Sequence, residues 1–267
     1  MKRILEVAIK TIKESGNILL NYIGEEKEIE LKGISNLVTQ VDKLSERHIL
    51  KSIEENFPDH SILTEETGFI NKNSEYTWIV DPLDGTTNYA HNFPFFGISI
   101  ALIKNKEIIL GLIYDPIRDE LFYAIKNEGA YLNDRRIEVS KTESLENSLI
   151  SFAFPYELSL EEKNFIPFIN FSSRTHGIRR TGSAAIEIAY VGCGRLDGFW
   201  AKKLKPWDIS AGILIVEEAK GKVTDFSGNN IDIHTDNILF SNGKIHQEMI
   251  KILNLGKIFI RNRNEKF

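Results

Sequence analysis

The sequence predicts an α+β fold in which helices and short strands are mixed along the whole chain. Two observations support this prediction. Apolar residues recur at three- and four-residue spacing near both ends and in several internal segments, as they do on the buried face of a helix. Between residues 95 and 125, β-branched and aromatic runs alternate with polar turns, as they do in an antiparallel meander.

The composition limits the size and class of the protein. With 267 residues, 42% hydrophobic and 27% charged, the chain can bury a large core. We expect one domain over residues 1–267, which could consist of two lobes, roughly 1–145 and 146–256. The net charge of -5 argues against nucleic-acid partners, and no apolar run reaches the length of a signal core or membrane span. We therefore expect a cytoplasmic protein without a membrane partner. The single cysteine, Cys193, excludes an intrachain disulfide and a cysteine zinc cluster.

The first half of the chain shows its elements through apolar periodicity and through helix-breaking residues. Residues 4–23 place apolar side chains on one helical face before Gly24, a common helix stop. Residues 41–57 do the same before Pro58, which cannot continue a helix. The polar, glycine-containing stretch 67–74 is expected to be a loop. The strands expected here are residues 28–32, 61–64, 78–80, 95–103, 107–114 and 120–125.

The second half begins with an expected turn at residues 129–135 and then alternates short strands with helices. Pro206 suits the first turn of a helix, and Gly221 suits its end. The helices expected here are residues 158–170, 182–191, 206–221 and 244–253. The strands expected here are residues 149–154, 196–200, 222–224 and 237–241. No internal repeat or low-complexity linker interrupts this order.

The stretch from residue 78 to residue 89 carries the strongest chemical signal. Three apolar residues run into Asp81 and Asp84, which predicts a buried strand that ends in an acidic turn. Gly85 and Thr86 follow at once and predict a helix start. Carboxylates are hard oxygen ligands for a metal, and the N–H groups at a helix start can bind phosphate. An ordinary Asp-capped turn would have the same sequence, so the rest of the chain must decide.

Further acidic residues occur at other expected strand ends and helix starts. Glu65 ends an early strand, Asp208 follows Pro206, and Asp42 lies in the first turn of the second helix. Taken singly, Asp42 would be a helix-dipole partner and Glu65 a solvated surface acid. Several carboxylates in one cleft repel one another unless a cation lies between them. Oxygen ligands without a cysteine pair or histidine cluster favour Mg²⁺, and Mg²⁺ beside a helix start favours phosphoryl chemistry.

In this order, these motifs resemble those of the lithium-sensitive, magnesium-dependent phosphatases typified by inositol monophosphatase. The resemblance covers nearly the whole chain. It rests on Val38–Asp42, Glu65–Glu66, Asp81–Asn88, Gly182–Ala185, Trp207–Gly212 and Glu217–Gly221. It implies a layered α/β/α/β/α sandwich of two sheets, of the inositol monophosphatase and fructose-1,6-bisphosphatase type, and a homodimer.

The resemblance also implies a role for each residue of the site. One Mg²⁺ would be held by Glu65, Asp81 and the Leu83 carbonyl oxygen. A second would be held by Asp81, Asp84 and Asp208, and Glu65 would reach a third through water. The catalytic residues would be Asp42, Thr86 and Glu65. The small phosphorylated substrate would be bound by Asp84, Gly85, Thr86, Ser183, Ala184 and Asp208.

The implied activity is hydrolysis of a small phosphorylated polyol, with inositol-1-monophosphate as the first candidate, by in-line attack of a metal-activated water. Inositol-specific relatives have a sugar-contacting glutamate seven residues before the position of Asp208, and this chain has Ala201 there. Alanine cannot bond a ring hydroxyl, which leaves other activities of the superfamily open. They are fructose-1,6-bisphosphatase, NADP(H) phosphatase and 3′-phosphoadenosine phosphate phosphatase. A regulatory binding protein that retains the fold is a further alternative. Lys202 and Lys203 would either attract a second phosphate or be solvated.

Overall fold

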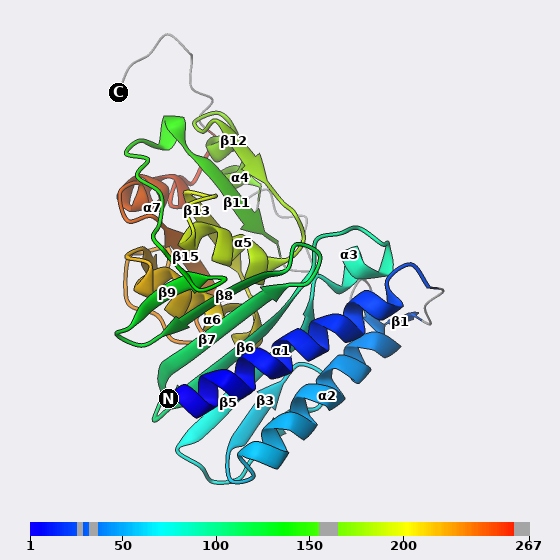
Figure 1. The fold of residues 1–267 in the computed structure, drawn as a ribbon. Helices are drawn as coiled ribbons and strands as arrows, with labels where there is room; N and C mark the ends of the chain where they lie inside the picture. Colours follow the sequence, from blue (N-terminus) through cyan, green and yellow to red (C-terminus); the bar gives the residue numbers. More distant parts are fainter. Residues whose placement is uncertain (26–28, 32–36, 155–164, 259–267) are drawn as a thin grey trace.

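Two main sheets, separated and flanked by pairs of helices, make up the protein (Figure 1). The structure is a computed structural model, and it describes residues 1–25, 29–31, 37–154 and 165–258. Four buried apolar clusters lie between successive layers of helices and strands. The layers follow one another as helices, eight-stranded sheet, helices, five-stranded sheet and helices. The predicted α/β/α/β/α sandwich is therefore confirmed.

The first layer consists of α1 (Lys2–Tyr22) and α2 (Gln40–Asn56), which lie side by side on one face of the larger sheet (Figure 1). Both helices form because their apolar residues recur every three or four positions and pack on the sheet. The helix α2 also buries two carboxylates, those of Asp42 and Glu46. Buried carboxylates need hydrogen-bond or charge partners, so these two residues indicate a site.

The larger sheet has eight strands in the order β10-β9-β8-β7-β6-β5-β3-β4. These are β3 (Ser61–Thr64), β4 (Gly68–Ile70), β5 (Tyr76–Asp84), β6 (Gly97–Lys104), β7 (Glu107–Asp115), β8 (Glu120–Ile125), β9 (Gly129–Leu132) and β10 (Arg135–Ile137). The neighbours β3 and β5 run parallel, whereas the meander from β5 through β8 is antiparallel. Parallel neighbours end at the same edge of a sheet, so Glu65 and Asp81 are brought to one edge.

Two stretches that we expected to lack strands contain them. The expected loop 67–74 includes β4, which pairs with β3. The expected turn 129–135 contains β9 and the start of β10, joined by a two-residue turn. Asn133 and Asp134 in that turn have φ of 45° and 63°, as a type I′ turn requires. Such short strands are defined by their pairing partners, which periodicity in the sequence does not reveal.

The middle layer consists of α5 (Ala184–Gly192) and α6 (Pro206–Glu218). Both helices are apolar on several faces because a sheet covers each side of the layer. In β7, a Cβ added at Gly111 would lie 2.7 Å from the carbonyl oxygen of Ala211 in α6. Glycine at this position therefore lets α6 pack directly against the backbone of the larger sheet.

The smaller sheet has the strand order β12-β11-β13-β15-β14. Its strands are β11 (Leu149–Ala153), β12 (Gly177–Arg179), β13 (Gly198–Lys202), β14 (Lys222–Thr224) and β15 (Asn237–Ser241). Its far face packs against α4 (Ile166–Ser172) and α7 (His246–Leu253). We did not predict β12. Of the helix expected over 158–170, residues 158–164 lie outside the described residues.

The remaining described elements are short. They are the strand pair β1 (Ile29–Leu31) and β2 (Leu37–Thr39), the helix α3 (Thr86–Ala90) and a 3₁₀ turn, Leu145–Asn147. None of the helices in the described ranges combines the length and hydropathy needed to cross a bilayer.

Candidate active site

The carboxyl end of β5 forms the centre of the candidate site. We expected the strand to end at Val80, but it continues through the acidic residues to Asp84. Its register against β6 shifts between Asp81 and Asp84. Such an irregularity changes the direction of side chains at the end of a strand. Both carboxylates are buried, with Asp81 1% and Asp84 9% exposed.

Asp81 lies among several negative charges. Its Oδ1 accepts a hydrogen bond from the Leu83 backbone N–H at 3.0 Å. Burial is the largest cause that raises the pKa of Asp81 well above its ordinary value, and Glu65, Asp84 and Asp208 raise it further. These three side chains therefore lie close enough for their charges to act on Asp81. Glu65 is half-buried in the turn after β3.

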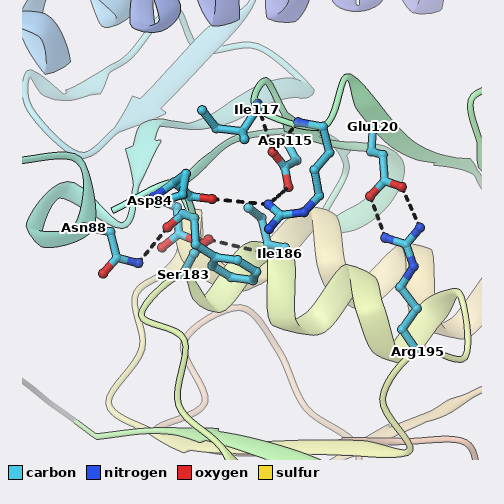
Figure 2. Close-up of polar contacts among 11 residues, drawn as sticks. Asp84, Asn88, Asp115, Ile117, Glu120, Ser183, Ile186 and Arg195 are labelled. Atoms are coloured by element: carbon cyan, nitrogen blue, oxygen red, sulfur yellow. Dashed lines mark hydrogen bonds and ion pairs between the residues drawn. The ribbon is translucent and has the colours of Figure 1, made fainter. Parts of the chain in front are cut away.

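Asp84 is bound to the start of α5 (Figure 2). Its Oδ2 accepts a hydrogen bond from Ser183 Oγ at 2.5 Å. It accepts a second one from the Ala185 N–H at 2.7 Å. Burial raises the pKa of Asp84 to about 6, while the bonds from Ser183, Ala185 and Ala184 act in the opposite direction. Ser183 is the N-cap of α5, where a helix favours a nearby anion. Ser183 and Ala184, which we expected to contact substrate, are thus directed at Asp84.

Asp208 enters the site from the first turn of α6. Its Oδ2 accepts a hydrogen bond from the Lys205 N–H at 2.7 Å, which fixes the start of the helix. Burial raises the pKa of Asp208 well above its ordinary value, and the charges of Asp84 and Glu65 add to the effect. Residues far apart in the sequence, in the turn after β3, on β5 and on α6, therefore converge.

Thr86 connects this acidic group to α2. Its Oγ1 donates to Asp42 Oδ1 or to the Leu83 carbonyl oxygen, each at 3.1 Å. Asp42 is 2% exposed, so its carboxylate is buried against the start of α3. A carboxylate that served only the helix dipole of α2 would not need this contact. The structure thus places the two residues as one hydrogen-bonded pair.

Gly85 occupies a tight position between Asp84 and Thr86. Its φ is 93°, in the left-handed region, and an added Cβ would lie 3.2 Å from the carbonyl oxygens of Gly182 and Phe95. Both the conformation and the space therefore require glycine. This packing holds the turn after β5 against the segment that precedes α5.

Sequence reasoning gave no role to Asn88, which also fixes the turn after β5 against the segment that precedes α5. Its Nδ2 donates to the Phe95 carbonyl oxygen at 2.6 Å (Figure 2). It also donates to the Thr181 carbonyl oxygen at 2.7 Å. The only signal in the sequence was its place directly after Thr86 and Thr87. An asparagine that donates to two carbonyl oxygens positions both of their segments.

The chemistry of the donor set fits a hard divalent cation. Glu65, Asp81, Asp84 and Asp208 offer only oxygen ligands, which Mg²⁺ and Ca²⁺ prefer. A cation would also relieve the mutual repulsion that raises the pKa of Asp81 and Asp208. Within the described ranges, no three Asp, Glu, His or Cys side chains already form a cluster that could hold an ion. Asp84 and Asp208 instead direct oxygens at backbone N–H groups.

Ala201 and Lys202 lie in β13 and Lys203 follows it, whereas the acidic residues of the candidate site lie on other elements. Ala201 is 0% exposed in β13, between Ala153 and Ile238, so its side chain belongs to the core. Lys203 is exposed, and Lys202 Nζ lies 6.0 Å from the ring centroid of Phe226. The side chain at position 201 therefore offers no polar contact to a ligand.

The chain resembles known proteins over almost its whole length. Residues 1–255 match the family model described as the inositol monophosphatase family. An inositol-1-monophosphatase from Synechocystis sp. is 42% identical over 93% of this chain and 88% of its own. A fructose-1,6-bisphosphatase/inositol-1-monophosphatase from Thermotoga maritima is 40% identical over 94% of this chain and 95% of its own. The crystal structure of the extragenic suppressor protein suhB from Bartonella henselae is 39% identical, with a TM-score of 0.92 over 96% of this chain and 100% of that chain.

Proposed function

Because this chain belongs to the inositol monophosphatase family, we propose that it is a Mg²⁺-dependent phosphomonoesterase acting on a small phosphorylated polyol. One observation carries the proposal. The charges of Glu65, Asp84 and Asp208 act on the buried Asp81, and the backbone of Leu83 connects Asp81 to Thr86, which also donates to Asp42. Buried acids that repel one another, next to a hydroxyl–carboxylate pair, suit a metal-assisted hydrolase.

The acidic group is the proposed metal site. Two or three Mg²⁺ ions would be held by Glu65, Asp81, the Leu83 carbonyl oxygen, Asp84 and Asp208. When bound, Mg²⁺ neutralises phosphate charge and makes water a stronger nucleophile at neutral pH.

The pair of Thr86 and Asp42 accepts the proton that the attacking water loses. The Thr86 hydroxyl donates to Asp42 or to the Leu83 carbonyl oxygen, which leaves its lone pairs to accept a hydrogen bond from the attacking water. Asp42 then receives the threonine proton as a general base, and Glu65 orients the same water. The attack is in line with the leaving group and forms no phosphoenzyme.

The substrate phosphate lies against the turn after β5. The N–H groups of Gly85 and Thr86 bind its oxygens, because the close packing around Gly85 fixes the direction of this backbone. Ser183 and Ala184 border the substrate and hold Asp84 at the same time.

Inositol-1-monophosphate is the leading candidate substrate, because a relative that is 42% identical is named inositol-1-monophosphatase. The Thermotoga maritima relative is also named as a fructose-1,6-bisphosphatase, which makes fructose-1,6-bisphosphate a second candidate substrate. The buried Ala201 offers no acceptor to an inositol hydroxyl. We therefore extend the proposed range to sugar bisphosphates, with NADP(H) and 3′-phosphoadenosine phosphate as further candidates.

Phosphate release from these four compounds tests the activity. We expect release that requires Mg²⁺, stops with EDTA and is inhibited by lithium, and that is fastest with inositol-1-monophosphate or fructose-1,6-bisphosphate. If no compound is hydrolysed at saturating Mg²⁺, the phosphatase proposal is wrong. A regulatory binding protein that retains the fold would then be favoured.

We also propose that the protein is cytoplasmic and that it is a homodimer, of which only the dimer is implied by the family resemblance. Light scattering coupled to size-exclusion chromatography measures the mass directly. The chain mass is 30.5 kDa, so a particle of this mass at micromolar concentration would contradict the dimer.

A further inference from the structure

A second buried carboxylate of α2, Glu46, binds the turn that carries Glu65. Glu46 is 4% exposed. Its Oε1 accepts from Thr64 Oγ1 at 2.5 Å, from the Glu66 N–H at 3.1 Å and from the Thr67 N–H at 3.2 Å. Its Oε2 accepts from Thr67 Oγ1 at 2.7 Å. The donors come from Thr64 and Glu66, on either side of Glu65, and from Thr67.

The turn needs this support because the strands beside it are short. Residues 65–67 connect β3 to β4, and β4 is a three-residue strand at the edge of the larger sheet. A strand pair of this length is weakly held by its own backbone bonds. Hydrogen bonds to a carboxylate are shorter and stronger than neutral ones, so Glu46 fixes the turn to α2.

The position of Glu46 on α2 connects the turn to the proposed proton acceptor. Asp42 lies four residues earlier, so the two side chains project from the same helical face one turn apart. Asp42 accepts from Thr86 at 3.1 Å, while Glu46 holds the turn of Glu65. One rigid helix thus sets the distance between the proposed water-activating pair and the proposed metal ligand.

We propose that Glu46 is a positioning residue, which fixes Glu65 for the metal without touching metal or substrate. The inference rests on the metal-dependent activity proposed above. Partners that orient a metal ligand change metal affinity when they are removed, even though they bind no metal themselves. Glu46 acts through the backbone of the turn on both sides of Glu65.

Variants of Glu46 are expected to fold. A surface depression of about 480 Å³ is lined by several residues of α2, including Glu46, and by Glu66 and Thr67 of the turn. Water can therefore reach the N–H groups that Glu46→Ala leaves without the carboxylate. In Glu46→Gln, the amide oxygen can accept the same bonds and the amide nitrogen can donate to Thr67 Oγ1. This variant removes the charge and keeps the geometry.

A matched control lies on the same helix. Ser52 Oγ forms a hydrogen bond with Thr11 Oγ1 at 2.6 Å, between α2 and α1. Ser52→Ala removes one side-chain hydrogen bond of α2 that lies apart from the turn of Glu65. It shows how a general loss of stability in α2 affects metal binding.

The experiment measures metal binding separately from catalysis. The full chain is titrated with Mn²⁺ by calorimetry, and phosphate release is measured as a function of Mg²⁺. We expect Glu46→Ala to weaken metal affinity by about 10- to 100-fold. The Mg²⁺ concentration for half-maximal rate should rise by the same factor, while kcat at saturating Mg²⁺ changes less. Glu46→Gln should stay close to the wild type, and Ser52→Ala should keep wild-type affinity.

Two results of the binding experiment would overturn the inference. One is wild-type metal affinity in Glu46→Ala, and the other is an equal loss in Glu46→Gln. Hydrogen exchange adds a test without metal, because the Glu66 and Thr67 amides should lose protection in Glu46→Ala and keep it in Glu46→Gln. Unchanged protection in Glu46→Ala would also overturn the inference. A wild-type chain that binds no metal would instead contradict the proposed function.

Discussion

Asp81 occupies a position in β5 where an apolar side chain would pack with less loss of solvation. It is 1% exposed, and burial together with the charges of Glu65, Asp84 and Asp208 raises its pKa. Burying a carboxylate among others of the same sign is unfavourable for folding. Proteins retain such arrangements where the chemistry requires them, which supports a functional role for Asp81.

Asp81→Asn separates this role from a role in folding. The substitution keeps the shape and removes one repulsive charge, so the free energy of unfolding without metal should stay the same or rise, by up to about 1 kcal/mol. Mg²⁺-dependent phosphate release should fall by about 100-fold or more, because a proposed ligand of both ions is lost. Urea denaturation and steady-state kinetics measure the two effects. The exposed Asp59→Asn serves as the control, and near wild-type turnover in Asp81→Asn would contradict the site.

Asp42 and Thr86 should behave as a unit in kinetics. The hydrogen bond between them, at 3.1 Å, suggests that they share one proton path. Loss of a general base slows a reaction by about 10²- to 10⁴-fold, and Asp42→Asn and Thr86→Val should each have an effect in this range. The double variant should be about as slow as the slower single variant, because the second change removes a path already broken. Additive losses in kcat at saturating Mg²⁺ would argue against a shared path.

At the scale of elements, His246 fixes the start of α7 to the smaller sheet. Its Nδ1 lies 2.7 Å from Ser241 Oγ of β15, and its Nε2 lies 2.9 Å from Thr224 Oγ1 of β14. The side chain is 0% exposed. Burial, with a smaller effect from the charge of Lys222, lowers the pKa of His246 to about 4. The folded protein therefore keeps this imidazole neutral in mild acid.

This burial predicts a loss of stability in mild acid. The unfolded histidine takes up a proton near its ordinary pKa of 6.5, whereas the folded one does so only at about 4. Between these values the unfolded state binds more protons, so the free energy of unfolding falls as the pH falls from about 6.5 to about 4. The loss from His246 has an upper limit of about 3 kcal/mol. Urea denaturation at several pH values should show a flatter profile for His246→Gln, and an unchanged profile would contradict this contribution.

Elements with strong local signals were predicted well, whereas those that depend on distant contacts were not. The bounds of β3 and β8 match the predicted ones, because β-branched and aromatic runs end at clear polar turns. The strand expected at 196–200 lies instead at Gly198–Lys202. The reason is that the Leu196 N–H still bonds to the Tyr190 carbonyl oxygen at the end of α5. No pattern in the sequence reveals that bond.

The candidate site shows the same division. The stretch from Asp81 to Thr86 could be identified from its own residues, and Asp208 was grouped with it by its place at a helix start. The pairing of Thr86 with Asp42 came from the family resemblance. Glu46 was missed because a glutamate on a helix usually faces water, and here it is 4% exposed. Only the fold shows that the turn after β3 lies against this position.

At the scale of the whole molecule, the middle helices join the two sheets. One face of α5 and α6 packs on the larger sheet, and another packs on the smaller sheet. The candidate site crosses the same boundary, since Asp81 comes from β5 and Asp208 from α6. We therefore propose that residues 1–267 form a single domain rather than two independent lobes, near 1–145 and 146–256.

This proposal predicts that both sheets unfold together. Urea unfolding followed by pulsed hydrogen exchange reports on β6 in the larger sheet and β15 in the smaller sheet separately. We expect one shared midpoint, because loss of either sheet exposes the apolar middle layer. Saturating Mg²⁺ should raise both midpoints equally, because the proposed ligands come from both sides of the boundary, and Asp81→Asn should abolish this shift. Two separate midpoints would instead favour two lobes. A shift confined to β6 would mean that the metal binds the larger sheet alone, without Asp208.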